Sequence, residues 1–198
     1  MAVANGADGG EDLGELQAMG ATSRRTAPSR PDRRVGRWAL FLGLAGAVLV
    51  VDQLTKAWLV ANVDPGGAIQ VLGDWLRFIH GRNDGGLFGM FKGSAELFAL
   101  ASIGVIALIV AYHARSRPSI VLSTALGLLL GGAIGNLIDR IRFGYVIDFV
   151  DAGIGGLRFY TFNVADSAIT GAILLLIVLA LFPQLGGSPD PAPEGPDA

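Results

Sequence analysis

The sequence contains no cysteine and only two histidines, His80 and His113, which lie far apart in the chain. The absence of cysteine excludes disulfides, thiol nucleophiles and cysteine-based metal sites. No H-E-x-x-H motif occurs, and no serine lies in a G-x-S-x-G setting, so zinc and serine hydrolase chemistry have little support. We therefore expect no metal ion and no other cofactor.

Charged residues are also scarce. They make up 16% of the 198 residues, whereas hydrophobic residues make up 52%. Soluble domains usually carry about a quarter charged residues, so this deficit predicts a surface that largely faces lipid. The net charge of −2 gives no reason to expect nucleic acid as a partner.

Two terminal segments differ in composition from the rest of the chain. Residues 1–34 are rich in Gly, Ala, Asp, Glu and Arg without apolar periodicity, and residues 184–198 are acidic and rich in proline. Both compositions are typical of disordered tails, so residues 35–183 are expected to form the one membrane domain.

Four apolar stretches lie between the tails, at about residues 37–63, 96–112, 119–138 and 165–182. Each approaches the ~20 residues that a helix needs to cross the hydrocarbon core, which predicts an all-α membrane protein built on a four-helix bundle. Alternation in WLRFIHG, within the connection 64–95, favours a strand. A small sheet or a lid lying on the membrane surface is therefore expected there.

The orientation of the predicted bundle follows from basic residues near the spans. Residues 24–37, at the start of the first span, carry six arginines against one acid, Asp32. This bias predicts a cytoplasmic N-terminus, and four spans return the C-terminus to the same side. The connections 64–95 and 139–164 are then extracytoplasmic.

Polar residues gather where the predicted spans meet the outer side, and ionisable groups in membrane spans mark a site by default. Asp52 and Lys56 are four residues apart and share a helix face, which favours an ion pair that orients the first span. Asn136, Asp139 and Arg140 share a face at the end of the third span. Arg140 is expected to compensate the charge of Asp139, which makes Asp139 a poor acid.

The third span also carries a ridge of glycines. Gly127, Gly131 and Gly135 recur every four residues, and Gly132 adds to the surface that they form. Small residues at this spacing let helix backbones approach closely, so tight packing on a neighbouring helix is expected.

Two further aspartates have surroundings that suit catalysis. Asp148 lies among apolar residues in the outer connection with no basic residue beside it, and Asn163 is placed to cap the fourth span, with Asp166 in its first turn. Taken singly, Asp148 is explained better by a solvated loop acid, and Asp166 by a favourable first-turn acid. Together they can hydrolyse a peptide bond without metal, because one ionised carboxylate deprotonates water while the protonated one hydrogen-bonds the scissile carbonyl.

Five motifs, VVDQLTKAWL, RNDGGLFG, GGAIGNLIDR, GYVIDFVD and FNVADSAI, resemble lipoprotein signal peptidase (signal peptidase II) in order and spacing. The resemblance covers about residues 37–182. It implies four transmembrane helices with a small extracytoplasmic β-cradle and a lid-like segment. It also implies an aspartic peptidase that removes the signal peptide of a prolipoprotein just before the lipidated cysteine, with Asp148 and Asp166 as the catalytic pair.

The same resemblance implies supporting or substrate-contacting roles for eight further residues: Asp52, Lys56, Asn83, Gly85, Asn136, Asp139, Arg140 and Asn163. It implies lipid-modified prolipoproteins and membrane lipid as partners, with no obligate protein partner. The expected location is the bacterial cytoplasmic membrane, with the active site at its extracytoplasmic face. The chain departs from the family pattern where Gly86-Leu87 replaces two alanines in the second motif.

Three other interpretations account for less of the sequence. A transporter or proton channel would place its acids near mid-membrane, often with inverted repeats, and no repeat relates the two halves of this chain. A purely structural four-helix protein does not need polar motifs that converge on one face. A presenilin-type aspartic peptidase needs a G-x-G-D sequence, which is absent.

Overall fold

The computed structural model describes residues 33–85, 93–116 and 118–186. Its long helices are α2 (Arg33–Asn62), α3 (Ala95–Arg115), α4 (Ile120–Phe143) and α5 (Val164–Leu181), and a short 3-10 helix, η2 (Pro183–Gly186), follows α5. All four long helices are long and apolar enough to cross a membrane, which confirms the predicted set of spans. Apart from Arg33, Arg34 and residues 184–186, the predicted tails lie outside the described residues.

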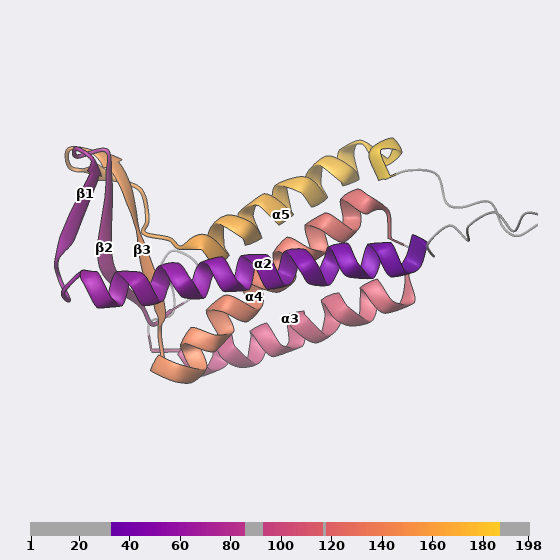
Figure 1. Ribbon diagram of the computed structural model, residues 1–198, viewed down its shortest axis with the longest axis horizontal. Helices are drawn as coiled ribbons and strands as arrows, with labels where there is room; N and C mark the ends of the chain where they lie inside the picture. Colours follow the sequence, from indigo (N-terminus) through magenta and orange to yellow (C-terminus); the bar gives the residue numbers. More distant parts are fainter. Residues whose placement is uncertain (1–32, 86–92, 117, 187–198) are drawn as a thin grey trace, which may run out of the picture. The chain divides into compact units, whose positions relative to one another are not determined.

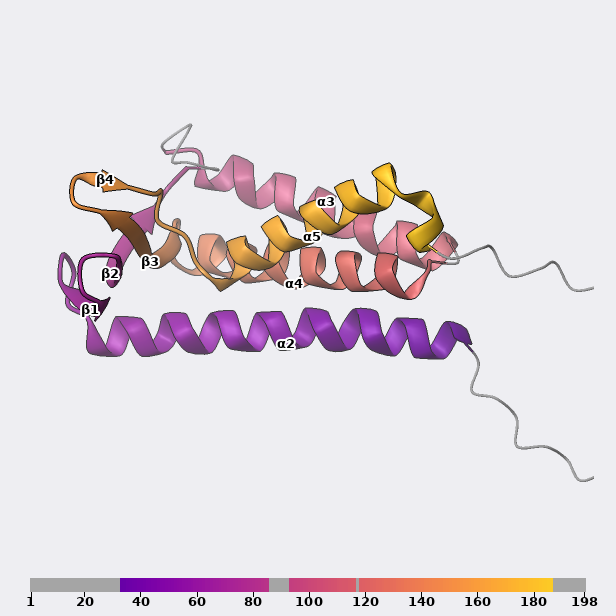
Figure 2. The same cartoon turned by 90° about the horizontal axis from the view of Figure 1, so that it is seen from above.

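Helix α4 is the central helix of the bundle. It packs against α2, α3 and α5, and Figure 2 shows α2 along one side of it with α3 and α5 on the other. Of the apolar segment of α4, 56% of the residues are buried, whereas only 11–17% are buried in the corresponding segments of the other three helices. The outer helices instead expose aliphatic side chains such as Leu100, Leu108 and Leu174, as expected for surfaces that face lipid.

The glycine ridge of α4 packs as predicted. A Cβ atom added to Gly127 or Gly131 would lie 2.8 Å from the carbonyl oxygen of Phe41 or 2.7 Å from that of Ala45, respectively. Any larger side chain would therefore push α2 away. Gly132 meets α5 in the same manner, because its added Cβ would lie 2.5 Å from the carbonyl oxygen of Ala165. The absence of side chains at these positions lets α4 approach both neighbours.

Four strands lie at the end of the bundle where α2 ends and α5 begins (Figure 1). They are β1 (Ala68–Leu72), β2 (Leu76–Asn83), β3 (Val146–Ile154) and β4 (Leu157–Arg158). They form one antiparallel sheet in the order β1-β2-β3-β4, and β2 confirms the strand expected from WLRFIHG. The connection 64–95, where a small sheet or a lid was expected, includes residues 86–92, which lie outside the described residues.

Strand β3 corrects one expectation, because Asp148 lies on this strand and not in a loop. Residues 146–149 are all buried, so the alternation that marks a half-exposed strand is missing from the sequence there. Phe149 and Ile147 pack with Leu59 of α2 in one apolar cluster. This cluster attaches β3 to the bundle and so fixes the position of Asp148.

Candidate active site

The first turn of α5 is built around a reciprocal pair of hydrogen bonds. Oδ1 of Asn163 accepts from the backbone N–H of Asp166 at 2.8 Å, and Oδ2 of Asp166 accepts from the backbone N–H of Asn163 at 3.3 Å. This capping box confirms that Asn163 caps the fourth span. The Asp166 carboxylate is thereby held at the helix N-terminus, where the helix dipole stabilises a negative charge.

Asn163 also reaches the second aspartate. Its Nδ2 donates to Oδ1 of Asp148 at 2.8 Å and to Oδ1 of Asn136 at 3.1 Å. Nδ2 of Asn136 in turn donates to Oδ1 of Asp166 at 2.8 Å. The structure thus brings Asp148 and Asp166 into one hydrogen-bonded unit, with an asparagine amide donating to each carboxyl group.

Asp148 is 1% exposed on β3, and Nδ2 of Asn83 donates to its second oxygen at 3.0 Å. Burial and, after it, the negative charge of Asp166 raise the pKa of Asp148 to about 7, against the opposing effects of Asn83, Lys56 and Asn163. Asp148 therefore holds a proton at pH values where an exposed aspartate has lost it.

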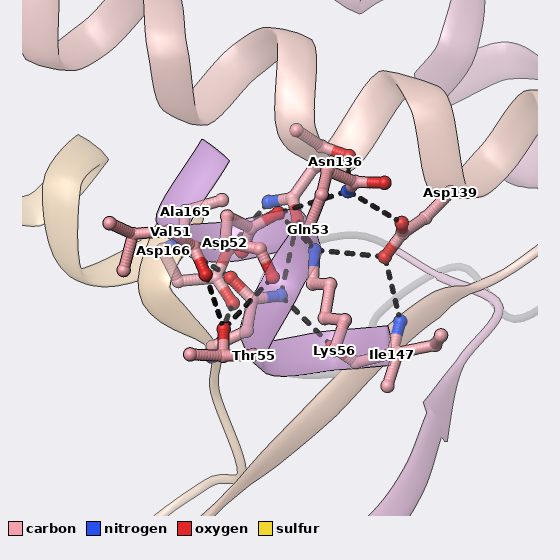
Figure 3. A network of polar contacts seen from close by, with 12 residues as sticks. Val51, Asp52, Gln53, Thr55, Lys56, Asn136, Asp139, Ile147, Ala165 and Asp166 are labelled. Carbon is pink, nitrogen blue, oxygen red and sulfur yellow. Dashed lines mark hydrogen bonds and ion pairs between the residues drawn. The ribbon is translucent and has the colours of Figure 1, made fainter. Parts of the chain in front are cut away.

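Lys56 is the centre of a second cluster, which lies beside the first (Figure 3). Its Nζ lies 2.8 Å from Oδ2 of Asp52 and 2.8 Å from Oδ2 of Asp139. The ion pair between Asp52 and Lys56 confirms the expectation from their spacing. The expected compensation of Asp139 by Arg140 is wrong, because the ion-pair partner of Asp139 is Lys56; consecutive helical residues do not face each other.

Both acids of this cluster also bind backbone groups. Oδ1 of Asp52 accepts from the N–H of Ala165 at 2.9 Å, and Oδ2 of Asp139 accepts from the N–H of Ile147 at 3.1 Å. The cluster therefore joins α2, α4, α5 and β3 around the two aspartates of the first unit. Asp52 and Asp139 are nearly inaccessible to solvent, so their charges are compensated within the protein.

Gln53 belongs to the same cluster, and the sequence analysis missed it. Its Nε2 donates to Oδ1 of Asp139 at 3.1 Å and to Oδ2 of Asp52 at 3.2 Å. The available signal was its position next to Asp52 in an apolar span, where a polar side chain needs a partner.

Arg140 lies on the other side of the unit. Its Nη2 donates to the carbonyl oxygen of Gly85 at 3.1 Å, and its guanidinium lies over the ring of Phe98. Asn83 accepts from the backbone N–H of Gly85 at 3.1 Å, so Gly85 is held from both sides. Nε of Arg140 is buried and has no hydrogen-bond partner within the part of the chain that the structure describes.

All ten residues singled out from the sequence are linked by hydrogen bonds or ion pairs into one network: Asp52, Lys56, Asn83, Gly85, Asn136, Asp139, Arg140, Asp148, Asn163 and Asp166. The departure at Gly86-Leu87 lies outside the described residues. Within residues 33–85, 93–116 and 118–186, no group of three or more His, Asp or Glu side chains is arranged to hold a metal ion.

Known proteins share both the sequence pattern and the fold. Residues 44–182 match the family described as signal peptidase (SPase) II. A lipoprotein signal peptidase of Geobacillus kaustophilus is 43% identical over 140 residues, covering 70% of this chain and 91% of the relative. That of Rhodococcus jostii is 39% identical over 176 residues, covering 86% of this chain and 84% of the relative.

One solved structure, titled a bacterial membrane enzyme determined by the in meso method at 2.3 Å resolution, superposes with a TM-score of 0.67 and 29% sequence identity. The match covers 78% of this chain and 94% of that protein. The family match includes all four spans except the first turns of α2, and it includes all ten residues of the network. The chain belongs to the signal peptidase II family.

Proposed function

We propose that this multi-pass membrane protease removes signal peptides from diacylglyceryl-modified prolipoproteins, cutting just before the lipidated cysteine, with Asp148 and Asp166 as an aspartic dyad. The observation that carries the proposal is the shared asparagine, Asn163, which bonds to both aspartates. Family membership and the names of the relatives support the substrate class.

The charge of the site favours one shared proton. Four buried or half-buried carboxylates lie in the network, together with only two cations, Lys56 and Arg140. The carboxylates therefore outnumber the cations, and a proton on the dyad reduces the excess of negative charge. We assign that proton to Asp148, whose pKa is raised to about 7, and the negative charge to Asp166, which lies at a helix N-terminus and accepts from Asn136.

The chemistry then follows the general acid–base scheme. Asp166 takes a proton from a water molecule as its oxygen attacks the scissile carbonyl carbon, and Asp148 gives its proton to the carbonyl oxygen. When the tetrahedral intermediate collapses, the C–N bond breaks and the leaving nitrogen takes the proton from Asp166. The carbonyl re-forms as its hydroxyl proton returns to Asp148, so both carboxyl groups regain their starting states.

The backbone N–H and C=O groups of a substrate need hydrogen-bond partners inside the membrane, because lipid tails offer none. The buried Nε of Arg140 has no hydrogen-bond partner among the described residues, so it is a donor available to a substrate carbonyl. We assign Arg140, Asn136 and Asn163 to hold the substrate backbone and the dyad. The acyl chains stay in lipid against the outer helices, while the peptide bond meets the sheet end of the bundle, which we place at the extracytoplasmic face with both termini in the cytoplasm.

The test is cleavage of a diacylglyceryl-modified prolipoprotein by the purified full-length protein in lipid nanodiscs. The lipidated precursor should be cut before its cysteine, and the unlipidated precursor should stay largely intact. Asp148→Asn and Asp166→Asn should both be inert, whereas Asp64→Asn should cleave like wild type, because Asp64 is exposed in the loop after α2. Equal rates on both precursors, or activity in either dyad variant, would contradict the proposal.

A further inference from the structure

Every N–H of the Lys56 ammonium already has an acceptor. A lysine has three donors, and Lys56 Nζ lies 2.8 Å from Asp52, 2.8 Å from Asp139 and 3.3 Å from Oδ1 of Asn136. The side chain of Lys56 is 3% exposed. Lys56 therefore has no donor left for a substrate, and any effect on the reaction has to pass through its neighbours.

Asn136 is the neighbour that connects Lys56 to the dyad. Oδ1 of Asn136 faces Nζ of Lys56 and Nδ2 of Asn163, and both of these atoms can only donate. The Asn163 amide cannot turn round, because its oxygen accepts from the backbone N–H of Asp166. The side-chain oxygen of Asn136 is thus fixed toward these two donors, so its NH₂ group must face Oδ1 of Asp166, at 2.8 Å.

We propose that Lys56 is a positioning residue of the peptidase, which holds Asp166 in its ionised, water-activating form through the side chain of Asn136. This inference rests on the proposed function, since it assumes that Asp166 is the base. It assigns Lys56 a role in the reaction itself, in addition to its ion pairs with Asp52 and Asp139.

The bond from Asn136 and the charge of Lys56 both favour an anion at Asp166, and the charge of Asp52 opposes it. The charged groups around Asp166 come from three elements. They are Asp52 and Lys56 on α2, Asp139 and Arg140 on α4, and Asp148 on β3. Asp52 offsets part of the charge of Lys56 at Asp166, which weakens the direct field of the ammonium there. The contact that favours the anion is the directed bond from Asn136, whose amide is polarised by the ammonium.

The measurement is the pH dependence of kcat/KM for wild type, Lys56→Met, Asn136→Ala and the double variant, on the lipidated precursor. Loss of Lys56 should move the acid limb of the profile upward by about one pH unit, the low end of the effect of a nearby opposite charge. In the Asn136→Ala background the same lysine substitution should move the limb by less than about 0.3 unit, because the connection is already broken.

Gln53→Leu is the matched control, because Gln53 donates to Asp52 and Asp139 within the same cluster. Its loss should lower the melting temperature without moving the acid limb. If Lys56→Met does not give folded protein, Asp52→Asn with Lys56→Met removes one charge of each sign and keeps the net charge of the cluster. Its acid limb should lie above that of Asp52→Asn alone by a similar amount.

Three outcomes would overturn the inference: an unmoved acid limb in the lysine variants, an equal shift in the presence and absence of Asn136, or an equal shift in Gln53→Leu. The first indicates a purely structural lysine, and the second indicates a field that acts through space. Each is distinct from failure of the proposed function, in which wild type does not prefer the lipidated precursor or Asp148→Asn and Asp166→Asn remain active.

Discussion

The side-chain amide of Asn163 donates to Oδ1 of Asp148 at 2.8 Å, and this bond joins the first turn of α5 to the middle of β3. Asn163 is fully buried, and its oxygen caps the helix that carries Asp166. One side chain therefore sets both the start of α5 and the donor that faces Asp148. The end of the helix and the hydrogen bond to Asp148 therefore depend on the same residue.

Asn163→Ala should consequently lower both stability and turnover. Loss of a helix cap costs about 1 kcal/mol, and Asp148 loses one of its two amide donors. Ser119→Ala is the matched control, because Ser119 caps α4 by accepting from the N–H of Leu122 far from the dyad. Thermal melting should show a similar fall for both variants, while single-turnover cleavage should fall only for Asn163→Ala. Equal turnover in the two variants would refute a role for Asn163 in the dyad.

Asp148→Asn and Asp166→Asn should each abolish turnover in a folded protein that still binds the precursor. Each substitution keeps the shape of the side chain and removes either the proton donor or the base, and such groups contribute about 10²–10⁴-fold. The double variant should be little slower than either single variant, because the two carboxyl groups act as one unit. Single-turnover rates measured beside melting curves test this; additive losses would show that the two acids work independently.

The pKa of Asp148 predicts how activity and stability change with pH. Its value of about 7 in the folded protein lies above the ~3.9 of an unfolded aspartate. The folded state thus binds the extra proton, and the stabilisation that results is complete below about pH 3.9 and is lost as the pH rises through about 7. Turnover should fall over the same upper range, as Asp148 loses the proton that it donates.

Asp148→Asn supplies the check on that assignment. The amide does not titrate, so this variant should lack the fall in melting temperature that Asp148 causes in the wild type between about pH 4 and pH 7. Asp151→Asn should behave in the opposite way, because hydrogen bonds from Arg158 and Arg77 lower the pKa of Asp151. This substitution should lower the melting temperature at neutral pH, because it removes a stabilisation that the wild type loses only in acid. An unchanged pH dependence in Asp148→Asn would show that another group carries the raised pKa.

Local signals in the sequence were sufficient for the spans, the cap of α5 and the ion pair between Asp52 and Lys56, since each depends on residues within one or two helical turns. The glycine ridge was equally visible, because its four-residue period is a property of one helix. The strand at Asp148 was missed because both of its faces are buried at that point. The pairing of Asp139 with Lys56 was missed because it joins two helices, and only their packing determines which cation lies nearest.

Packing of the glycine ridge gives a prediction with an internal control. Gly131→Ala places a methyl group 2.7 Å from the carbonyl oxygen of Ala45, and overpacking of this kind usually costs about 1–3 kcal/mol. Gly104→Ala, in α3, has nothing within 4 Å of the added atom and should be neutral or slightly stabilising, since alanine favours helix. Melting of the two variants in the same detergent separates the effects; equal melting temperatures would mean that α2 shifts at no cost.

Asp139→Asn tests how the buried cluster supports the site. Asp139 accepts from Gln53 on Oδ1 and from both Lys56 and the backbone of Ile147 on Oδ2. Asparagine has one acceptor oxygen, so its NH₂ group must face at least one of these donors, which costs about 1–3 kcal/mol for a buried unsatisfied group. Lys56 keeps Asp52 as a partner, and Arg140 loses no ion pair in the substitution.

The variant should therefore melt at a lower temperature than wild type and turn over more slowly, while a folded fraction remains active. That pattern differs from the one expected for the dyad, where turnover is lost entirely in protein that remains folded. Single-turnover cleavage and thermal melting of Asp139→Asn, Asp148→Asn and Asp166→Asn under the same conditions give the comparison. If Asp139→Asn melts like wild type and is inert, while Asp148→Asn still cleaves, then the dyad is Asp139 with Asp166, and β3 only supports the site.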